Sequence, residues 1–136
     1  MSRENVEVVA AQLREFKTTH RPAPVGRFTA PNFVWDMRTF EGWPDEDEYR
    51  GGDGYMRFFA RWTEPYDEWD FDVEDLVDAS DDRVVAIVRQ RGRLRGADSW
   101  VELRFGTVCT LAEGLIQRMQ VFTTPEEAFE AVGLRE

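Results

Sequence analysis

The amino-acid sequence predicts an α+β protein, because two helical patterns come early in the chain and a run of long strands follows them. Apolar residues recur at helical spacing from Val6 to Phe16, and "GGDGYMRFFARW" repeats that spacing from Tyr55 to Trp62. The turn signals "ASDD", "RGAD" and "AEG" then separate four extended segments. This order indicates one curved sheet that folds over the helices. The extended segments cover roughly residues 68–78, 83–95, 99–111 and 115–123.

Three shorter elements complete the predicted order. Residues 33–37 form a strand that includes Asp36. Before it, "THRPAPVGRFTAPN" contains three prolines and one glycine, so any helix there must be short and lie near residues 25–29. A capping box that begins at Thr124 predicts a short terminal helix that ends at Gly133.

The length and the cysteine content fit one intracellular domain. A chain of 136 residues buries roughly two-thirds of its unfolded surface, so residues 1–136 are predicted to form a single domain. Cys109 is the only cysteine, which excludes an intrachain disulfide and a cysteine-based metal site and fits a reducing compartment. The start "MSRENVEVVA" lacks a signal peptide's apolar stretch, and no run approaches the roughly 20 apolar residues that span a bilayer. We therefore expect a cytoplasmic protein.

The charge distribution disfavours several classes of partner. The net charge is -10, and the acids concentrate between residues 41 and 82, where the only basic residues are Arg50, Arg57 and Arg61. Such a field repels phosphate backbones and anionic membranes, so neither nucleic acid nor a membrane is an expected partner. The acidic stretch "DEDEYRGGDG" lacks the ligand spacing of a calcium loop, and no metal site is predicted.

Three stretches of the sequence resemble one protein family. They are "SRENVEVV", "VWDM..FEGWP....YRG.DG...FF..W" and "DLVDASDDRVVAIVRQRGRLRG", which together extend over nearly the whole chain. On these motifs the chain resembles the SnoaL-like (polyketide cyclase-like) proteins of the nuclear transport factor 2-like superfamily. The resemblance implies a cone-shaped, cystatin-like α+β fold, in which N-terminal helices pack in a strongly curved mixed or antiparallel sheet around an axial pocket. It also implies a homodimer that pairs through the outer face of the sheet.

The resemblance carries catalytic residues over only in part, and fold alone does not give function. In the steroid isomerases of the superfamily, an aspartate at the end of the first strand is the general base, and Asp36 matches that position. The two oxyanion-hole positions fall on Leu13 and Thr107. Leu13 cannot donate a hydrogen bond and Thr107 is not a strong acidic donor, so steroid-type isomerisation is disfavoured.

Two other activities of the superfamily fit the sequence no better. Relatives that hydrolyse epoxides use an Arg-x-Asp motif, but the corresponding "RFG" has Gly106 in place of the acid. The cyclases use an acid and a histidine, and the only histidine here, His20, lies in the proline-rich loop and is expected to face solvent. No cofactor is implied by any of these patterns.

Two charged residues are candidates for catalysis. Asp36 continues the face of Val34 in its strand and is expected to face the cavity. Arg89 shares a face with Val85 and Ile87, which leaves two interpretations open. Either the strand leaves the core and its arginines face water or the acidic segment, or Arg89 points into the cone and pairs with Asp36 or with a ligand carboxylate.

The candidate ligand contacts combine aromatic side chains with a few polar ones, as small-molecule pockets do. Trp43 lies in a Gly-Trp-Pro turn, where an indole can cover a cavity mouth. Strand alternation places Gln117 on the face of Met119 and puts Thr107 on an apolar strand face. The complete set is Trp43, Phe58, Trp62, Thr107, Gln117 and Met119.

Two functional hypotheses follow. In the first, the chain binds a small hydrophobic, carbonyl-containing molecule in the internal pocket, and Asp36 forms a buried ion pair. In the second, the chain is a cofactor-free isomerase, cyclase or lyase, in which Asp36 is the general base and Arg89 or Thr107 supports the developing negative charge.

Overall fold

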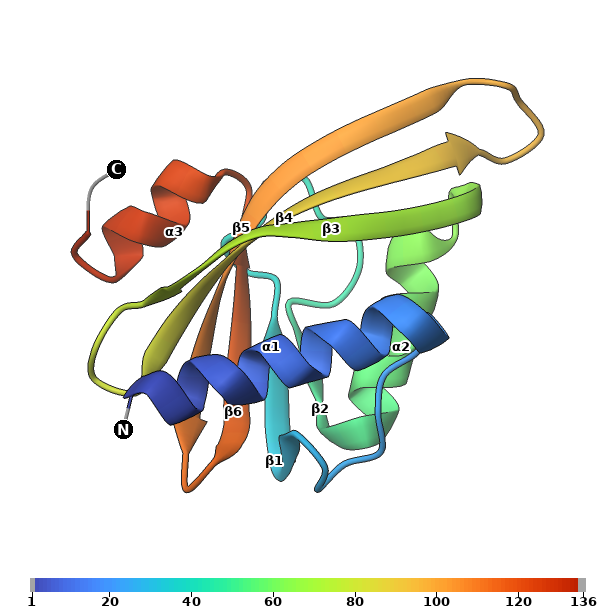
Figure 1. Cartoon of the computed structure of the whole chain (residues 1–136). Helices are drawn as coiled ribbons and strands as arrows, with labels where there is room; N and C mark the ends of the chain where they lie inside the picture. The colour runs from blue at the N-terminus through green and yellow to red at the C-terminus, as the bar shows by residue number, and fades with distance from the viewer. Residues whose placement is uncertain (1, 135–136) are drawn as a thin grey trace.

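One curved six-stranded sheet organises the molecule (Figure 1). The computed structural model describes residues 2–134, and its strands follow the order β2-β1-β6-β5-β4-β3 across the sheet. β1 and β6 run parallel and the other neighbouring strands antiparallel, so the sheet is mixed. The strands span Thr29–Asp36 (β1), Glu48–Arg50 (β2), Tyr66–Asp78 (β3), Arg83–Leu94 (β4), Trp100–Ala112 (β5) and Leu115–Phe122 (β6).

Two helices, α1 (Ser2–Thr19) and α2 (Gly51–Thr63), lie on the concave side of the sheet (Figure 1). Each buries the apolar stripe that its sequence spacing predicts, because residues three and four apart share one face of a helix. The predicted α+β fold with helices packed in a curved sheet is therefore confirmed. The buried residues of the two stripes are Val9, Leu13, Phe16, Tyr55, Phe58 and Trp62.

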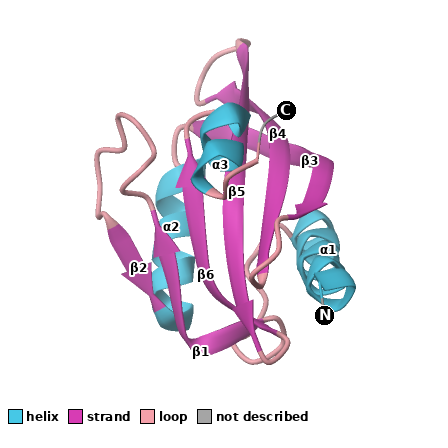
Figure 2. Cartoon of the chain, turned by 90° about the vertical axis from the view of Figure 1, so that its left-hand side faces the viewer, coloured by secondary structure: helices cyan, strands magenta, loops and turns pink. Residues whose placement is uncertain are grey.

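A third helix, α3 (Pro125–Ala131), covers part of the convex face, and Figure 2 shows it in front of the sheet with α2 behind. The predicted cap is present, since the Thr124 hydroxyl accepts a hydrogen bond from the backbone N–H of Glu127 at 3.2 Å. Phe129 packs in a second apolar cluster that includes Val85 and Ile87 of β4. The apolar residues on this face of β4 thus have their cover within the chain.

The structure departs from the predicted elements at two places. Residues 25–29 form turns and the start of β1, not a helix, and the backbone N–H of Gly26 bonds to the carbonyl of Thr29 at 2.8 Å. β2 was not predicted, because three residues are too few to show an alternating pattern. It pairs with the end of β1 and brings Glu48 beside Asp36.

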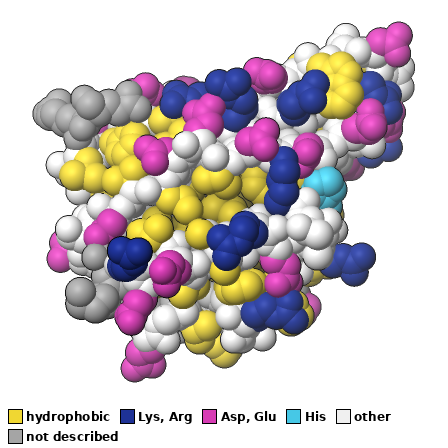
Figure 3. Space-filling model, viewed as in Figure 1, with side chains coloured by type: hydrophobic (Ala, Val, Ile, Leu, Met, Phe, Trp, Pro, Cys, Tyr) yellow, Lys and Arg dark blue, Asp and Glu magenta, His cyan; other side chains and the backbone are white. Residues whose placement is uncertain are grey.

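The face on which α1 lies against β3 exposes apolar side chains among charged ones (Figure 3). Leu13 of α1 and Phe71 of β3 line a groove there. Within residues 2–134, no helix combines the length and the apolar character that crossing a bilayer requires.

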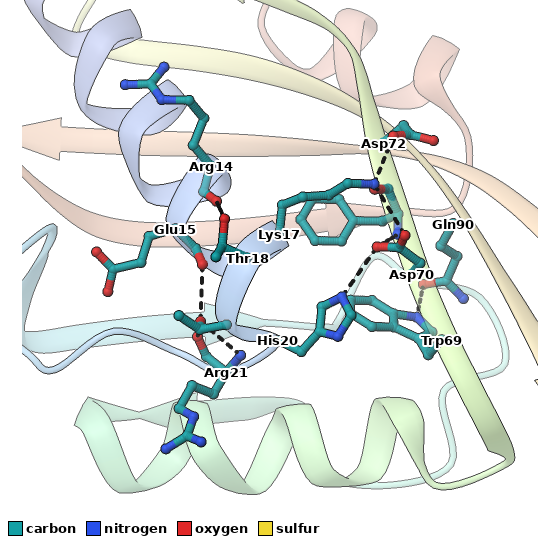
Figure 4. A network of polar contacts seen from close by, with 12 residues as sticks. Arg14, Glu15, Lys17, Thr18, His20, Arg21, Trp69, Asp70, Asp72 and Gln90 are labelled. Carbon is teal, nitrogen blue, oxygen red and sulfur yellow. Dashed lines mark hydrogen bonds and ion pairs between the residues drawn. The ribbon is translucent and has the colours of Figure 1, made fainter.

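Lys17 fastens the last turn of α1 to β3 (Figure 4). Its Nζ donates to Asp72 Oδ1 at 2.9 Å, to the Phe71 carbonyl at 2.5 Å and to Asp70 Oδ2 at 3.3 Å. The hydrogen bond to Asp72 is the largest cause of a raised pKa at Lys17, although burial opposes it. His20 is exposed and contacts the other oxygen of Asp70 at 3.3 Å. This network links the C-terminal end of α1 and His20 to β3, beside the ring of Trp69.

Candidate functional site

The cone encloses an apolar cavity of about 60 Å³ between the two inner helices and the concave face of the sheet. Nine aromatic side chains line it, and its hydroxyl groups belong to Tyr55 and Thr107. Among the described residues, no Asp, Glu, His, Lys or Arg lines this cavity. A space of this size holds only a few water molecules, so the aromatic rings nearly fill the cone.

Four of the six predicted ligand contacts line this cavity. They are Phe58, Trp62, Thr107 and Met119. Gln117 does not, because it lies at a register irregularity in β6, where Ile116 pairs with Leu111 and Arg118 with Thr110. A bulge adds one residue to a strand and so breaks the alternation on which the prediction relied. Ile116 and Met119 both reach the inner core although they are three residues apart, so simple alternation fails here and does not bring Gln117 into the cavity.

Asp36 lies on the opposite side of β1 from the cavity, so the prediction that it faces the cone is wrong. Trp35 lines the cavity, and successive side chains of a strand alternate between faces. The Asp36 side chain is nevertheless fully buried, with an exposed fraction of 0%. Its partners come from the convex side of the sheet.

Two arginines hold the Asp36 carboxylate. Arg38 donates to it from its backbone N–H at 2.9 Å, from Nε at 3.1 Å and from a terminal nitrogen at 2.8 Å. Arg118 donates to Oδ2 at 2.5 Å and to Glu48 at 3.0 Å. Burial by itself raises the pKa of Asp36, but the hydrogen bonds from Arg38 and Arg118 together outweigh it, and the pKa is lower than usual. The carboxylate is therefore ionised and paired at neutral pH.

Arg89 also lies on the convex face, which corrects the interpretation that it points into the cone and pairs with Asp36. The inner face of β4 carries Ala86 and Val88, and Arg89 falls on the other face. Its Nε contacts Glu74 at 2.8 Å, and its side chain is half exposed. The alternative interpretation, in which the arginines of this strand face water or the acidic segment, describes Arg89 correctly, since Glu74 belongs to that segment.

A wider pocket of about 570 Å³ lies at the mouth of the cone. The side chain of Trp62 lines both this mouth pocket and the inner cavity, so it forms a common wall. Trp43 lies here, with its ring centroid 5.7 Å from that of Trp62, and does not line the inner cavity. Phe40 and Leu103 add apolar surface. The mouth pocket has the volume of a typical small-molecule site.

The hydroxyl of Tyr49 fixes the loop that carries Trp43. It accepts hydrogen bonds from Trp43 Nε1 at 3.1 Å and from the backbone N–H of Glu46 at 3.2 Å. It donates to Asp45 Oδ2 at 2.6 Å. Burial, and then the hydrogen bond to Asp45, raise the pKa of Tyr49 to about 12, so the hydroxyl keeps its proton. Trp43 is thereby positioned over the mouth pocket.

Gln90 is a site residue that the sequence reasoning missed. Gln90 lies between Arg89 and Arg91 in "RQRGRLR", and the charged residues of this stretch suggested that the whole segment faces solvent. The signal was the alternation itself, because Gln90 continues the inward face of Ala86 and Val88. In the structure it is 2% exposed and lines the mouth pocket beside Trp62.

Comparison with known proteins assigns the family. The family model for the SnoaL-like domain matches residues 9–119. The chain belongs to this family. No curated protein matches the chain. The resemblance that the sequence motifs indicated is confirmed.

Solved structures share the fold of this SnoaL-like chain. A nuclear transport factor 2-like protein of Burkholderia thailandensis is 27% identical, with a TM-score of 0.72, over 89% of this chain and 91% of its own. TerC, co-crystallised with polyporic acid, is 17% identical to this chain. The match has a TM-score of 0.71 and covers 95% of this chain and 98% of TerC. A Catenulispora acidiphila protein with a ketosteroid isomerase-like fold, solved in complex with trimethylamine, is 13% identical to this chain. The match has a TM-score of 0.64 and covers 94% of this chain and 93% of that protein.

Proposed function

We propose that this SnoaL-like chain binds a small hydrophobic, carbonyl-containing molecule in the mouth pocket, with the inner cavity behind it. The observation that carries the proposal is a pocket of about 570 Å³ that has Trp62 in common with the apolar, aromatic cavity and also contains the buried side chain of Gln90. Small-molecule sites combine apolar walls with a few polar groups. The mouth pocket has apolar walls at Phe40, Trp43, Trp62 and Leu103, and its polar lining residues are Asp45, Arg61, Glu64, Tyr66 and Gln90. The complexes of TerC with polyporic acid and of the Catenulispora protein with trimethylamine support small-molecule binding by this fold.

Binding without general-base catalysis by Asp36 is favoured over the enzymatic alternative. Asp36 lies across the sheet from the cavity, and two arginines already hold its carboxylate. A general base must come within hydrogen-bond reach of the proton that it removes. A ligand in the mouth pocket would be separated from Asp36 by the sheet.

Fluorine NMR of the fluorotryptophan-labelled protein tests the proposed site. The chain has five tryptophans, and single Trp→Phe variants would assign their resonances. We expect acetophenone, a small aromatic ketone, to shift the signals of Trp43 and Trp62 and to leave that of Trp100 unchanged. Trp100 is the internal control because it is 44% exposed at the start of β5 and lines neither cavity. Equal shifts at all five positions, or none, would contradict the proposal.

We also propose that two chains pair through the convex face of the sheet. The family resemblance supports this arrangement, and part of that face is free of α3. There, the guanidinium carbon of Arg91 lies 4.5 Å from the ring centroid of the exposed Trp100, and Arg89 forms an ion pair with Glu74. Sedimentation equilibrium at micromolar concentration should give twice the chain mass of 15.9 kDa. Arg91→Glu should shift the equilibrium toward monomer, whereas Arg57→Glu on α2 should not; a wild-type monomer would contradict the proposal.

A further inference from the structure

We infer that the side-chain amide of Gln90 recognises an acceptor oxygen of the ligand, and that the site therefore selects neutral carbonyl compounds over hydrocarbons of the same shape. This inference rests on the proposed function and names the chemical class that the mouth pocket binds. It follows from where Gln90 lies, how its amide is oriented and which of its hydrogen-bonding groups is left unused.

The position of Gln90 places a polar group at the boundary between the two cavities. Gln90 follows Ala86 and Val88 along the inward face of β4, beyond the part of that face which lines the inner cavity. It pairs across the sheet with Leu103, which also lines the mouth pocket. At 2% exposure, its side chain lies almost entirely within protein. A buried polar group of this kind requires hydrogen-bonding partners.

Two indole groups fix the orientation of the amide. Gln90 Oε1 accepts hydrogen bonds from Trp62 Nε1 at 2.5 Å and from Trp69 Nε1 at 3.0 Å. An indole nitrogen can only donate, so a reversed amide would place its own N–H groups against both indoles. The oxygen must therefore face the two tryptophans. Figure 4 shows Trp69 and Gln90 joined in this way.

The amide nitrogen of Gln90 is left with its donors unused. It carries two N–H groups, and no acceptor among residues 2–134 bonds to it. Because Oε1 is directed at the two indoles, Nε2 is the polar atom that Gln90 presents to the mouth pocket. The carbonyl oxygen of a ligand would accept from this nitrogen. A hydrocarbon in the same place would leave the donor buried without a partner, which penalises its binding.

A matched pair of probes tests the inference directly. Acetophenone and α-methylstyrene have the same planar skeleton, but a carbonyl oxygen in the first is replaced by a methylene group in the second. We expect the wild-type chain to bind acetophenone about tenfold more tightly, as one well-placed hydrogen bond allows. NMR titration measures both affinities.

Two variants separate recognition by Gln90 from general packing. Gln90→Glu keeps an oxygen for the two indoles but presents a second oxygen to the ligand, so the preference for acetophenone should disappear at neutral pH. The matched control, Gln120→Glu, makes the same change on β6, outside both cavities, and should keep the preference. If Gln90→Glu does not fold, the wild-type Gln90 side-chain amide resonance provides the test. It should move on titration with acetophenone and much less with α-methylstyrene.

The outcomes distinguish this inference from the function on which it rests. Equal binding of both probes to the wild type, at the tryptophans of the mouth pocket, would overturn the role of Gln90 and leave the binding function intact. An unchanged preference in Gln90→Glu, or an amide resonance that responds equally to both probes, would also overturn it. Binding of neither probe would overturn the inference together with the proposed function.

Discussion

Trp62→Ala is expected to lower the free energy of unfolding by about 3–5 kcal/mol, the usual cost of removing a large buried aromatic side chain. Trp62 is 9% exposed, and its ring centroid lies 5.3 Å from that of Phe40 and 5.5 Å from those of Phe58 and Phe105. Its loss would also remove one of the two donors that orient Gln90. Urea denaturation followed by far-UV circular dichroism measures the change, and acetophenone binding should be lost with it.

Two further substitutions control for the effect of Trp62→Ala. Trp62→Phe keeps an aromatic ring in the wall and should recover most of the stability, although the hydrogen bond to Gln90 is absent. Trp100→Ala removes an exposed tryptophan and should change stability by less than about 1 kcal/mol. A similarly small loss in Trp62→Ala would mean that the neighbouring rings close over the gap and that Trp62 is not the wall between the two cavities.

Asp36→Asn is expected to lower the free energy of unfolding by about 2 kcal/mol at neutral pH, because it removes the charge that two arginines bind. Breaking a fully buried ion pair costs about 3–5 kcal/mol, but here Arg38 and Arg118 keep 55% and 32% of their side chains exposed and can be rehydrated. The substituted asparagine side chain would retain an acceptor oxygen but not the charge. Urea denaturation of the variant beside wild type measures this loss of stability. The control substitution Asp98→Asn, at an exposed position, should leave the free energy of unfolding unchanged.

The stability difference between wild type and Asp36→Asn should depend on pH in a defined direction. The pKa of Asp36 is lowered in the folded state, so the unfolded chain takes up a proton first as the solution is acidified. The contribution of Asp36 is therefore complete above the ordinary aspartate pKa of about 3.9 and is lost as the pH falls through the lower folded value. A difference that instead declined near neutral pH would show a raised pKa and would contradict the ion pairs of Asp36 with Arg38 and Arg118.

Helix spacing and turn signals were sufficient to predict the order of the main elements, because these patterns are local. Alternation was not sufficient to predict which face of β4 lies inside the cone, because β4 is apolar on both faces. Ala86 and Val88 face the cavity, whereas Val85 and Ile87 pack with α3. Alternation separates these two sets but does not say which is inside, since α3 and the cavity both supply apolar surroundings. This ambiguity is why two interpretations of Arg89 stayed open until the structure placed Val85 and Ile87 on the convex face.

The candidate site could be predicted where a side chain belongs to one unambiguous helical face. Phe58 and Trp62 line the cavity because they lie on the buried stripe of α2. The partners of Asp36 could not be predicted, since Arg118 is far along the sequence and becomes its neighbour only through the pairing of β1 with β6. Gln117 was misplaced by a bulge, and bulges leave no clear mark in a single sequence.

The parallel pairing of β1 with β6 has a consequence for the kinetics of folding. β3, β4, β5 and β6 are consecutive strands joined by short turns, whereas the contact between Asp36 and Arg118 links residues 82 positions apart. Closing so long a loop costs more chain entropy than closing a hairpin, so we expect this contact to form after the antiparallel strands have paired. Contacts made after the transition state act mainly on the rate of unfolding. The ion pairs of Asp36 would then govern how long the cone stays closed once it has formed.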